Sequence, residues 1–327
     1  MSGQRRRFCY KKVYHITNRA TEGLPFVPNK FIELLIGGLL ARTQEKYPGI
    51  VLNALVFMGN HYHAIITVNT DPSTLSYFMG YFQGELSGVI HRLMGVSNRR
   101  LWATKFKATA LLTPETVMAK LNYLYSNPAA SDLVESINDW EGFSTWHELN
   151  GGVSRSFRWI SDSLIESRLP REDFTDKSIS KLVESLSDLG GGPRVLECDP
   201  FFWKKCFKEY KNRSDDELKQ ELLGMIKEKE EEYRSERKNN GFSVMGAGKL
   251  RYQSIYKSYK PRKFGTTPLF ESTCQETGKQ FRSAYQTFKE TCTKVYESWK
   301  KGRFELMLPP GAFYPPLRPR ASILVAT

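Results

Sequence analysis

The chain has 327 residues, 40% of them hydrophobic, and a formal net charge of +13 at pH 7. This hydrophobic content is that of a globular protein, and the length allows two domains. No stretch approaches the roughly 18 consecutive apolar residues of a membrane span, and the start MSGQRRRF lacks the apolar region of a secretory signal. The positive charge favours a polyanionic partner, nucleic acid above all, although an unspecialised basic surface is the alternative.

The five cysteines are widely spaced, and none belongs to a C-x-x-C pair. Structural zinc and a disulfide framework are therefore both disfavoured. This cysteine usage fits a reducing cytoplasm.

The first part of the chain predicts a strand, a helix and a β-hairpin. Residues 8–17 (FCYKKVYHIT) are rich in aromatic and β-branched residues, as strands are. Residues 31–47 carry apolar residues at helical spacing and are followed by a Pro-Gly pair that stops the helix. Residues 50–57 and 61–68 predict two strands joined by a tight turn.

Two helices with a strand between them follow. Residues 72–93 come after an aspartate that can cap a helix, begin with proline, and carry a long apolar stripe. Residues 101–112 predict a short strand or hairpin. Residues 114–127 repeat the cap-and-proline start, and an Asn-Pro pair is expected to end that helix. This order predicts an α+β fold with helices packed against an antiparallel sheet.

The second half of the chain differs in composition. Glycine-rich stretches at 151–152 and 190–193 are candidate joints, and a capping-box match at 214–217 begins a long charged helix. We therefore predict one domain over residues 1–150 and a basic, mostly helical accessory domain over residues 151–327.

Two histidines stand one residue apart in the stretch FMGNHYHAII. Residues i and i+2 of a strand point to the same face, so His61 and His63 are expected side by side, with Tyr62 as an outward-facing spacer. Two adjacent imidazoles can bind one divalent metal ion. The alternative is a chance H-x-H in which one histidine only caps a turn.

A tyrosine and an asparagine share one face of a predicted helix. Tyr123 and Asn127 lie four residues apart, which is about one helical turn. A tyrosine hydroxyl is a weak nucleophile because its pKa is about 10, but it can attack phosphorus beside a metal ion that neutralises a phosphodiester. Asn127 could supply an amide oxygen as a third ligand or orient the phosphate. The alternative is that Tyr123 packs in the core and Asn127 only terminates the helix.

Three segments resemble, in the right order, blocks of single-tyrosine HUH transposases, most closely the branch of REP-associated tyrosine transposases. They are YHITNRATEG at 14–23, FMGNHYHAII at 57–66 and YLYSNPAASDLV at 123–134. The family's histidine block reads M-P-N-H-Y-H, and its tyrosine block reads Y-I-x-x-N-P-V-R-A-x-L-V. The resemblance implies a ferredoxin-like HUH domain with a central antiparallel sheet.

By position, the resemblance implies His61 and His63 as metal ligands and Tyr123 as the nucleophile. It implies that Asn127, one turn later, helps to hold the metal. Tyr125 is a second tyrosine of the block, but its side chain points about 200° round the helix from Tyr123.

The chain departs from the family pattern at two places. Gly59 stands where the histidine block has proline, which changes only the turn. The run Ala129-Ala130-Ser131 replaces V-R-A, so the family's arginine is missing at Ala130. If that arginine contacts DNA or the tyrosine helix, its loss implies an altered affinity or specificity for DNA.

Basic and aromatic residues outside these blocks are candidate DNA contacts, because single-strand binding uses cations for phosphates and rings for unpaired bases. The candidates are Arg5, Arg6, Arg7 and Arg19 near the amino terminus, and Lys249, Arg251, Tyr252, Tyr256, Lys257, Tyr259, Lys260, Arg262 and Lys263. The alternatives are a solvated basic arm and a helix whose tyrosine face packs inward. His15, in the first block, is either beside the DNA path or a hydrogen-bonded sheet histidine.

The resemblance implies a transposase that cleaves and rejoins single-stranded DNA at hairpin-associated sites through a 5′-phosphotyrosine intermediate, with Mg²⁺ or Mn²⁺ as cofactor. It implies a bacterial cytoplasmic protein, on the nucleoid when bound to DNA. The protein would be either a monomer or a homodimer that exchanges the tyrosine helix. The alternatives are a domesticated DNA-binding protein of the same fold without turnover, and an HUH replication or transfer initiator.

Overall fold

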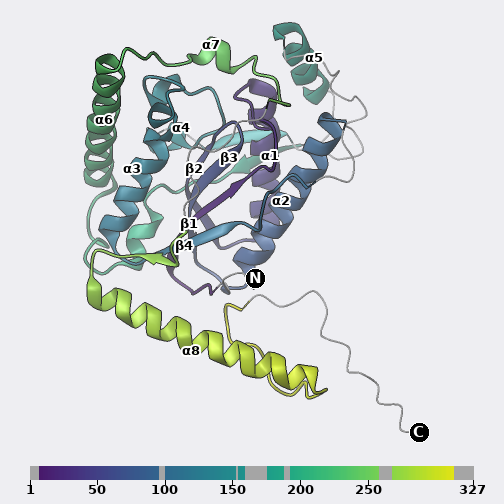
Figure 1. The fold of residues 1–327 in the computed structure, drawn as a ribbon, viewed down its shortest axis with the longest axis vertical. Helices are drawn as coiled ribbons and strands as arrows, with labels where there is room; N and C mark the ends of the chain where they lie inside the picture. The colour runs from purple at the N-terminus through teal and green to yellow at the C-terminus, as the bar shows by residue number, and fades with distance from the viewer. Residues whose placement is uncertain are drawn as a thin grey trace.

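A five-stranded sheet forms the centre of the fold (Figure 1). The computed structural model describes residues 7–95, 100–151, 154–158, 175–187, 192–257 and 267–312. The strands are β1 (Lys12–Arg19), β2 (Ile50–Phe57), β3 (His61–Val68), β4 (Lys107–Leu111) and β7 (Phe270–Glu271). Their order in the sheet is β2-β3-β1-β4-β7.

The first four strands pair antiparallel, as predicted, but the sheet as a whole is mixed. The short strand β7 comes from far downstream and runs parallel to the edge strand β4. The prediction of a purely antiparallel sheet is therefore wrong at this edge, because nothing in the two-residue segment Phe270–Glu271 marks it as a strand before its partner is known.

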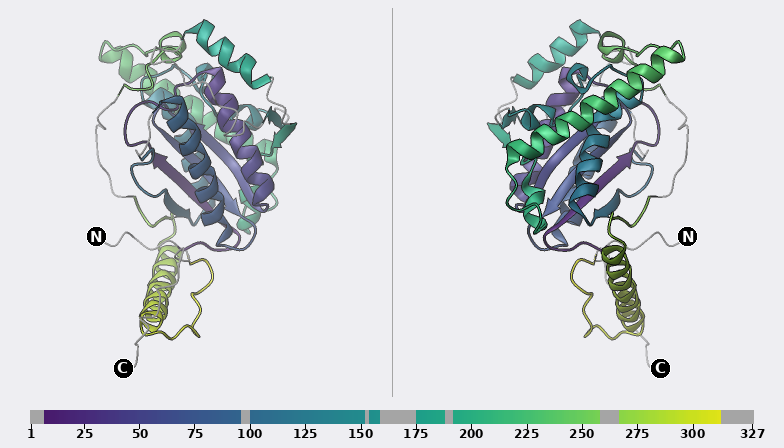
Figure 2. Two further views of the ribbon diagram at one scale, coloured as in Figure 1. Left: turned by 90° about the vertical axis from the view of Figure 1, so that its right-hand side faces the viewer. Right: turned by 90° about the vertical axis from the view of Figure 1, so that its left-hand side faces the viewer.

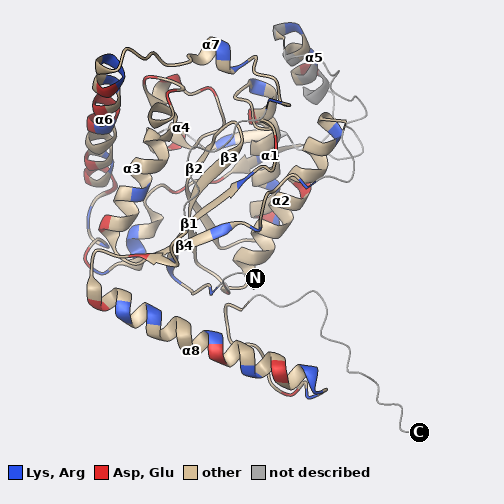
Figure 3. Ribbon diagram, viewed as in Figure 1, with Lys and Arg blue, Asp and Glu red and all other residues tan. Residues whose placement is uncertain are grey.

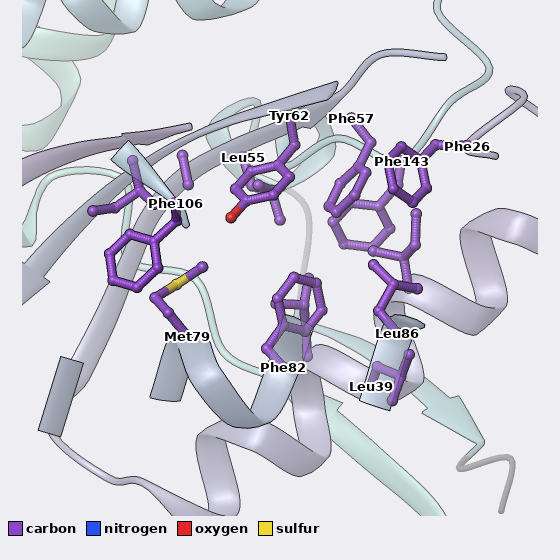
Figure 4. Close-up of a cluster of buried hydrophobic side chains, with 14 of the residues drawn as sticks. Phe26, Leu39, Leu55, Phe57, Tyr62, Met79, Phe82, Leu86, Phe106 and Phe143 are labelled. Atoms are coloured by element: carbon purple, nitrogen blue, oxygen red, sulfur yellow. The ribbon is translucent and has the colours of Figure 1, made fainter. Parts of the chain in front are cut away.

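Two helices cover one face of the sheet, α1 (Lys30–Lys46) and α2 (Thr74–Leu93). They bury the apolar stripes predicted for them against alternate residues of the strands. Tyr62 belongs to this cluster and is 1% exposed (Figure 4). Gln83 Nε2 donates a hydrogen bond of 2.5 Å to its hydroxyl. Tyr62 does point away from the histidines, but the prediction that it faces outward is wrong, because helices cover both faces of the sheet.

The other face of the sheet is covered by α3 (Pro114–Ala130), and α6 (Asp215–Asn239) packs on the outer side of α3 (Figures 1 and 2). The predicted capping box at Ser214 and Glu217 begins α6. The helix α3 starts at Pro114 as predicted but runs through Pro128. The expected end at Asn127-Pro128 is wrong. Pro128 lacks only its own N–H, so the helical hydrogen bonds resume after it, and the backbone N–H of Ser131 donates to the Asn127 carbonyl at 3.0 Å.

The remaining described elements are shorter, apart from one long helix. They are η1 (Ile137–Asp139), α4 (Trp146–Leu149), β5 (Arg155–Arg158), α5 (Asp176–Ser187), β6 (Pro193–Leu196), η3 (Phe202–Cys206), α7 (Ala247–Leu250) and the long α8 (Gln275–Lys300). Helix α8 projects from the edge of the sheet beyond β7 (Figure 2). Among the helices of the described ranges, none is both long and apolar enough to span a membrane.

Element boundaries differ from the predictions by a few residues. The hairpin strands are confirmed, whereas β1 begins at Lys12 and the strand expected over 101–112 covers only Lys107–Leu111. Helix α2 begins at Thr74 and not at Pro72. Asp71 Oδ1 accepts a hydrogen bond of 2.9 Å from the backbone N–H of Ser73, and this bond stabilises a turn before the helix.

Side chains from both sides of residue 150 share one hydrophobic core. Trp203, Leu218 and Leu222 pack with the side chains that α3 turns toward the sheet. The two halves of the chain are therefore in contact along α3. That they are two domains divided at residue 150 stays a prediction.

Candidate functional site

Three histidines and one tyrosine meet between the sheet and α3. His15 lies on β1, and His61 and His63 lie on β3, which is the neighbour of β1. Each occupies the face that also carries Ile65, a residue buried under α3. Tyr123 reaches the same place from α3.

The rings of this group lie close together. The centroids of His61 and His63 are 5.1 Å apart with perpendicular planes, and those of His63 and Tyr123 are 5.3 Å apart. The His15 centroid is 6.4 Å from that of Tyr123. The structure thus brings together the histidine pair and the tyrosine, which are separate motifs in the sequence.

Hydrogen bonds orient both rings of the histidine pair. His61 Nδ1 is 2.8 Å from Asn60 Oδ1, an oxygen that only accepts, so Nδ1 carries the proton and Nε2 keeps a lone pair. His63 Nδ1 is 3.0 Å from His15 Nε2. If His63 Nδ1 donates in this bond, His63 Nε2 also keeps a lone pair.

Burial holds all three imidazoles in the neutral form. It lowers the pKa of His15 to about 3, with the charge of Lys120 as a second cause. It lowers the pKa of His61 to about 4, with Arg19 as a second cause, and that of His63 well below its usual value. A neutral imidazole can donate its lone pair to a metal ion, whereas a protonated one cannot.

The buried histidines predict a loss of stability in acid. Each folded-state pKa lies below the ordinary value of 6.5, so at pH values between about 4 and 6.5 only the unfolded chain takes up these protons. The free energy of unfolding should therefore fall as pH decreases from 7 to 5, by at most about 1.4 kcal/mol per pH unit for each histidine. Urea denaturation of metal-free protein measures this slope. His15→Gln should reduce it, and equal stability at pH 7 and pH 5 would contradict the prediction.

Asn127 lies one turn after Tyr123 and is 7% exposed. Its Oδ1 accepts a hydrogen bond of 3.3 Å from Ser131 Oγ, and its Nδ2 has no partner among the residues that the structure describes. Within the same ranges, no group of three or more His, Cys, Asp or Glu side chains is placed to hold a metal ion. His61 and His63 as a donor pair for a divalent metal, and Asn127 as a third ligand, both stay predictions.

The two tyrosines of α3 have different surroundings. Tyr123 is 45% exposed, and burial of the rest of its side chain, with Tyr233 as a second cause, raises its pKa. Tyr125 is fully buried, and its hydroxyl lies 3.0 Å from Thr145 Oγ1. Only the Tyr123 hydroxyl is therefore placed to meet a large ligand.

Lys120 is a site residue that the sequence analysis missed. Tyr123 follows Lys120 by three residues on α3, and Lys120 Nζ lies 5.3 Å from the centroid of the Tyr123 ring. The same Nζ lies 2.9 Å from Glu271 Oε1 on β7. The i, i+3 spacing from Tyr123 is the signal that could have found it. Its ammonium group, which also pairs with Glu271, brings a positive charge beside the Tyr123 ring.

The candidate DNA contacts are dispersed. Arg19 pairs with His61 in the register of β1 and β3, so it lies at the site. Arg7 lies over the Phe288 ring on α8, with 5.7 Å between the guanidinium carbon and the ring centroid. Lysines and arginines also mark β1, β4, α7 and α8 in Figure 3.

Between residues 249 and 257, the basic and aromatic side chains are partly tied to the protein. Arg251 Nε donates to Glu141 Oε2 at 3.0 Å, and the Tyr256 hydroxyl donates to the Met94 carbonyl at 3.0 Å. Lys249, Tyr252 and Lys257 are exposed or partly exposed. Arg5, Arg6, Tyr259, Lys260, Arg262 and Lys263 lie outside the described residues.

His15 provides a test of the histidine pair. His15→Leu removes the nitrogen that can accept from His63 Nδ1, and should weaken Mn²⁺ binding about tenfold, as loss of an outer hydrogen-bond partner of a ligand does. His15→Gln places a carbonyl oxygen near the same point and should keep most of the affinity. Isothermal titration with Mn²⁺ measures both variants. Equal affinity in wild type and His15→Leu would show that His15 does not support the ligand.

Comparison with known proteins finds a likeness in structure and none in sequence families. No family model and no curated protein matches the chain. Among solved structures, it is similar to a REP-associated tyrosine transposase bound to a REP hairpin, with 20% sequence identity and a TM-score of 0.37. The match covers 46% of this chain and 86% of that chain. A TM-score this low carries no argument about function, which has to come from the side chains.

Proposed function

We propose that the protein cleaves and rejoins single-stranded DNA, with Tyr123 as the nucleophile. The supporting observation is that Tyr123, 45% exposed, lies beside His63, with 5.3 Å between the ring centroids, and that His63 lies beside His61, with 5.1 Å between theirs. A nucleophile and a donor pair for a metal are then within reach of one phosphate. The element order β-α-β-β-α-β from β1 to β4 supports the assignment to a ferredoxin-like HUH domain.

In the proposed reaction, Tyr123 Oη attacks the scissile phosphorus. The new O–P bond links the tyrosine to the 5′ side of the strand, the bond from phosphorus to the 3′ oxygen breaks, and that oxygen leaves as a 3′-hydroxyl after taking up a proton. The phenol proton passes to water. Reversal by a second 3′-hydroxyl rejoins DNA without ATP, because the phosphotyrosine keeps the energy of the broken bond.

The chain's own residues orient this step. His61 and His63 would hold Mg²⁺ or Mn²⁺, with Asn127 as the proposed third ligand, and the bound metal would neutralise the phosphate. Lys120 places a positive charge next to the attacking ring. Arg19, opposite His61 in the sheet, would contact the neighbouring phosphate.

A covalent adduct is the decisive test. The protein is incubated with Mn²⁺ and a library of DNA hairpins flanked by randomised single-stranded arms, and the products are run on a denaturing gel. We expect a protein–DNA adduct that disappears with EDTA and that peptide mass spectrometry locates at Tyr123. A native-gel shift without any adduct would instead support the alternative, a binding protein of the same fold without turnover.

The proposed partner is single-stranded or hairpin DNA, and the proposed setting is the bacterial cytoplasm and nucleoid. Strands released by the adduct assay would also distinguish a transposase from a replication or transfer initiator. A transposase should join the cleaved end to a second DNA end, and an initiator should leave the end for extension.

A further inference from the structure

A cavity of about 440 Å³ opens beside His61. This volume lies within the range of roughly 300–1,000 Å³ that is typical of small-molecule pockets. Polar side chains line part of it, namely Asn60, His61, Ser131 and Gln253. The rest is apolar and includes Leu24, Val27, Leu133, Trp140, Met245 and Leu250.

The lining is uncharged. None of the described residues around the cavity is Asp, Glu, Lys or Arg, so neither a phosphate nor a cation would meet an opposite charge there. A neutral ligand with apolar faces and hydrogen-bonding edges fits better. An unstacked nucleobase is such a ligand, since proteins hold single bases by stacking and by contacts to their edges.

A segment from the second half of the chain closes one side of the cavity. We define residues 245–255 as the strap. At its start, the backbone N–H of Met245 donates to the Asp132 carbonyl at 2.9 Å, and at its end the Ile255 carbonyl accepts from Leu24 N–H at 2.8 Å. Gly23 permits this second contact, because a Cβ there would lie 2.3 Å from the Ile255 oxygen.

Trp140 contributes an aromatic side chain to the lining of the cavity. Its ring packs so tightly on Gly142 that a Cβ there would lie 2.7 Å from the indole. The neighbouring Glu141 forms an ion pair with Arg251 of the strap. Trp140 and the strap are therefore fixed to each other, and the cavity is preformed.

We propose that this cavity takes one unpaired nucleobase of the DNA strand whose phosphate lies at His61 and His63. The inference rests on the proposed function and adds to it the part of the protein that reads the strand next to the cleaved bond. Met245, Leu250 and Gln253 then serve as base contacts, which gives the strap a role distinct from phosphate binding.

Ala130 offers a clean way to fill the cavity. It lines the cavity from the last turn of α3 and is exposed, so a larger side chain there need not disturb the core. Ala119 is also exposed on α3 but does not line the cavity. Ala130→Phe is thus the test variant, and Ala119→Phe is its matched control.

The experiment measures binding without cleavage. The hairpin library is first enriched for binding to the Tyr123→Phe protein, and each single-stranded nucleotide of the selected DNA is then replaced in turn by an abasic site. We expect one abasic position to weaken binding about tenfold, as loss of a stacked base does. When Ala130→Phe is added to Tyr123→Phe, binding of the intact strand should weaken by about the same factor. The abasic site at that position should then cause no further loss of affinity.

The outcomes separate the two proposals. Suppose that DNA binds, and that each abasic site reduces the affinity by the same factor in the Ala130→Phe protein as in the Ala119→Phe protein. In that case the nucleobase site is wrong and the proposed function stands. If no strand is enriched, both are wrong. Should Ala130→Phe fail to fold, Trp140→Phe replaces it, and an unchanged penalty at every position again overturns the site.

Discussion

Replacing Tyr123 with phenylalanine is expected to abolish the covalent adduct with single-stranded DNA. The substitution removes only the hydroxyl oxygen that would attack phosphorus and keeps the ring that packs on His63. Because Tyr123 is 45% exposed, the free energy of unfolding should change by less than about 0.5 kcal/mol. Adduct formation on a denaturing gel and urea denaturation measure the two effects.

Tyr125→Phe is the matched control and should show the opposite pattern. The Tyr125 hydroxyl is buried and lies 3.0 Å from Thr145 Oγ1, so its removal should cost about 1 kcal/mol of stability. The adduct should still form, since this side chain points into the core. An adduct that survives Tyr123→Phe but not Tyr125→Phe would reverse the assignment of the nucleophile.

Replacing Arg237 with methionine should give the largest loss of stability. Arg237 is 5% exposed on α6, where its Nη1 donates to the Ala129 carbonyl at 2.9 Å and its Nη2 donates to Glu135 Oε2 at 2.5 Å. The change removes one donor from that carbonyl, at the end of the tyrosine helix. The carbonyl keeps the hydrogen bond from the Asp132 backbone N–H at 3.1 Å. Because Glu135 is partly exposed and can be hydrated again, we expect a cost of about 2–3 kcal/mol.

Arg234→Met separates this effect from the general loss of a charge. Arg234 lies one turn earlier on α6 and also approaches Glu135, with its Nε 3.6 Å from Oε2, but its side chain is 50% exposed. An exposed ion pair contributes at most about 1 kcal/mol, so urea denaturation should show a small change. Equal losses in the two variants would contradict a special role for Arg237.

Local spacing in the sequence was enough to predict which residues of the candidate site share one face of a strand or helix. The i, i+2 spacing of His61 and His63 on a strand and the i, i+4 spacing of Tyr123 and Asn127 on a helix both depend only on backbone geometry. The capping box of α6 and the two hairpin strands are local in the same sense, and the structure has them where they were expected.

Features that depend on distant partners could not be predicted in this way. The bond between His15 and His63 requires the register of β1 against β3, which brings together residues 48 positions apart. The ion pair of Lys120 with Glu271 requires β7 to join the sheet. Tyr62 was misplaced because strand periodicity distinguishes two faces but does not say that both are covered.

The enclosure of α3 has a consequence for the kinetics of the proposed reaction. Tyr123 meets His63 of its own chain, and α3 is held between its own sheet and α6. Because the tyrosine and the histidine pair lie together on one chain, a single molecule carries this candidate site without a tyrosine helix from a second copy. Strand cleavage by the protein–DNA complex should then be first order. Its rate constant should not change when the complex is diluted.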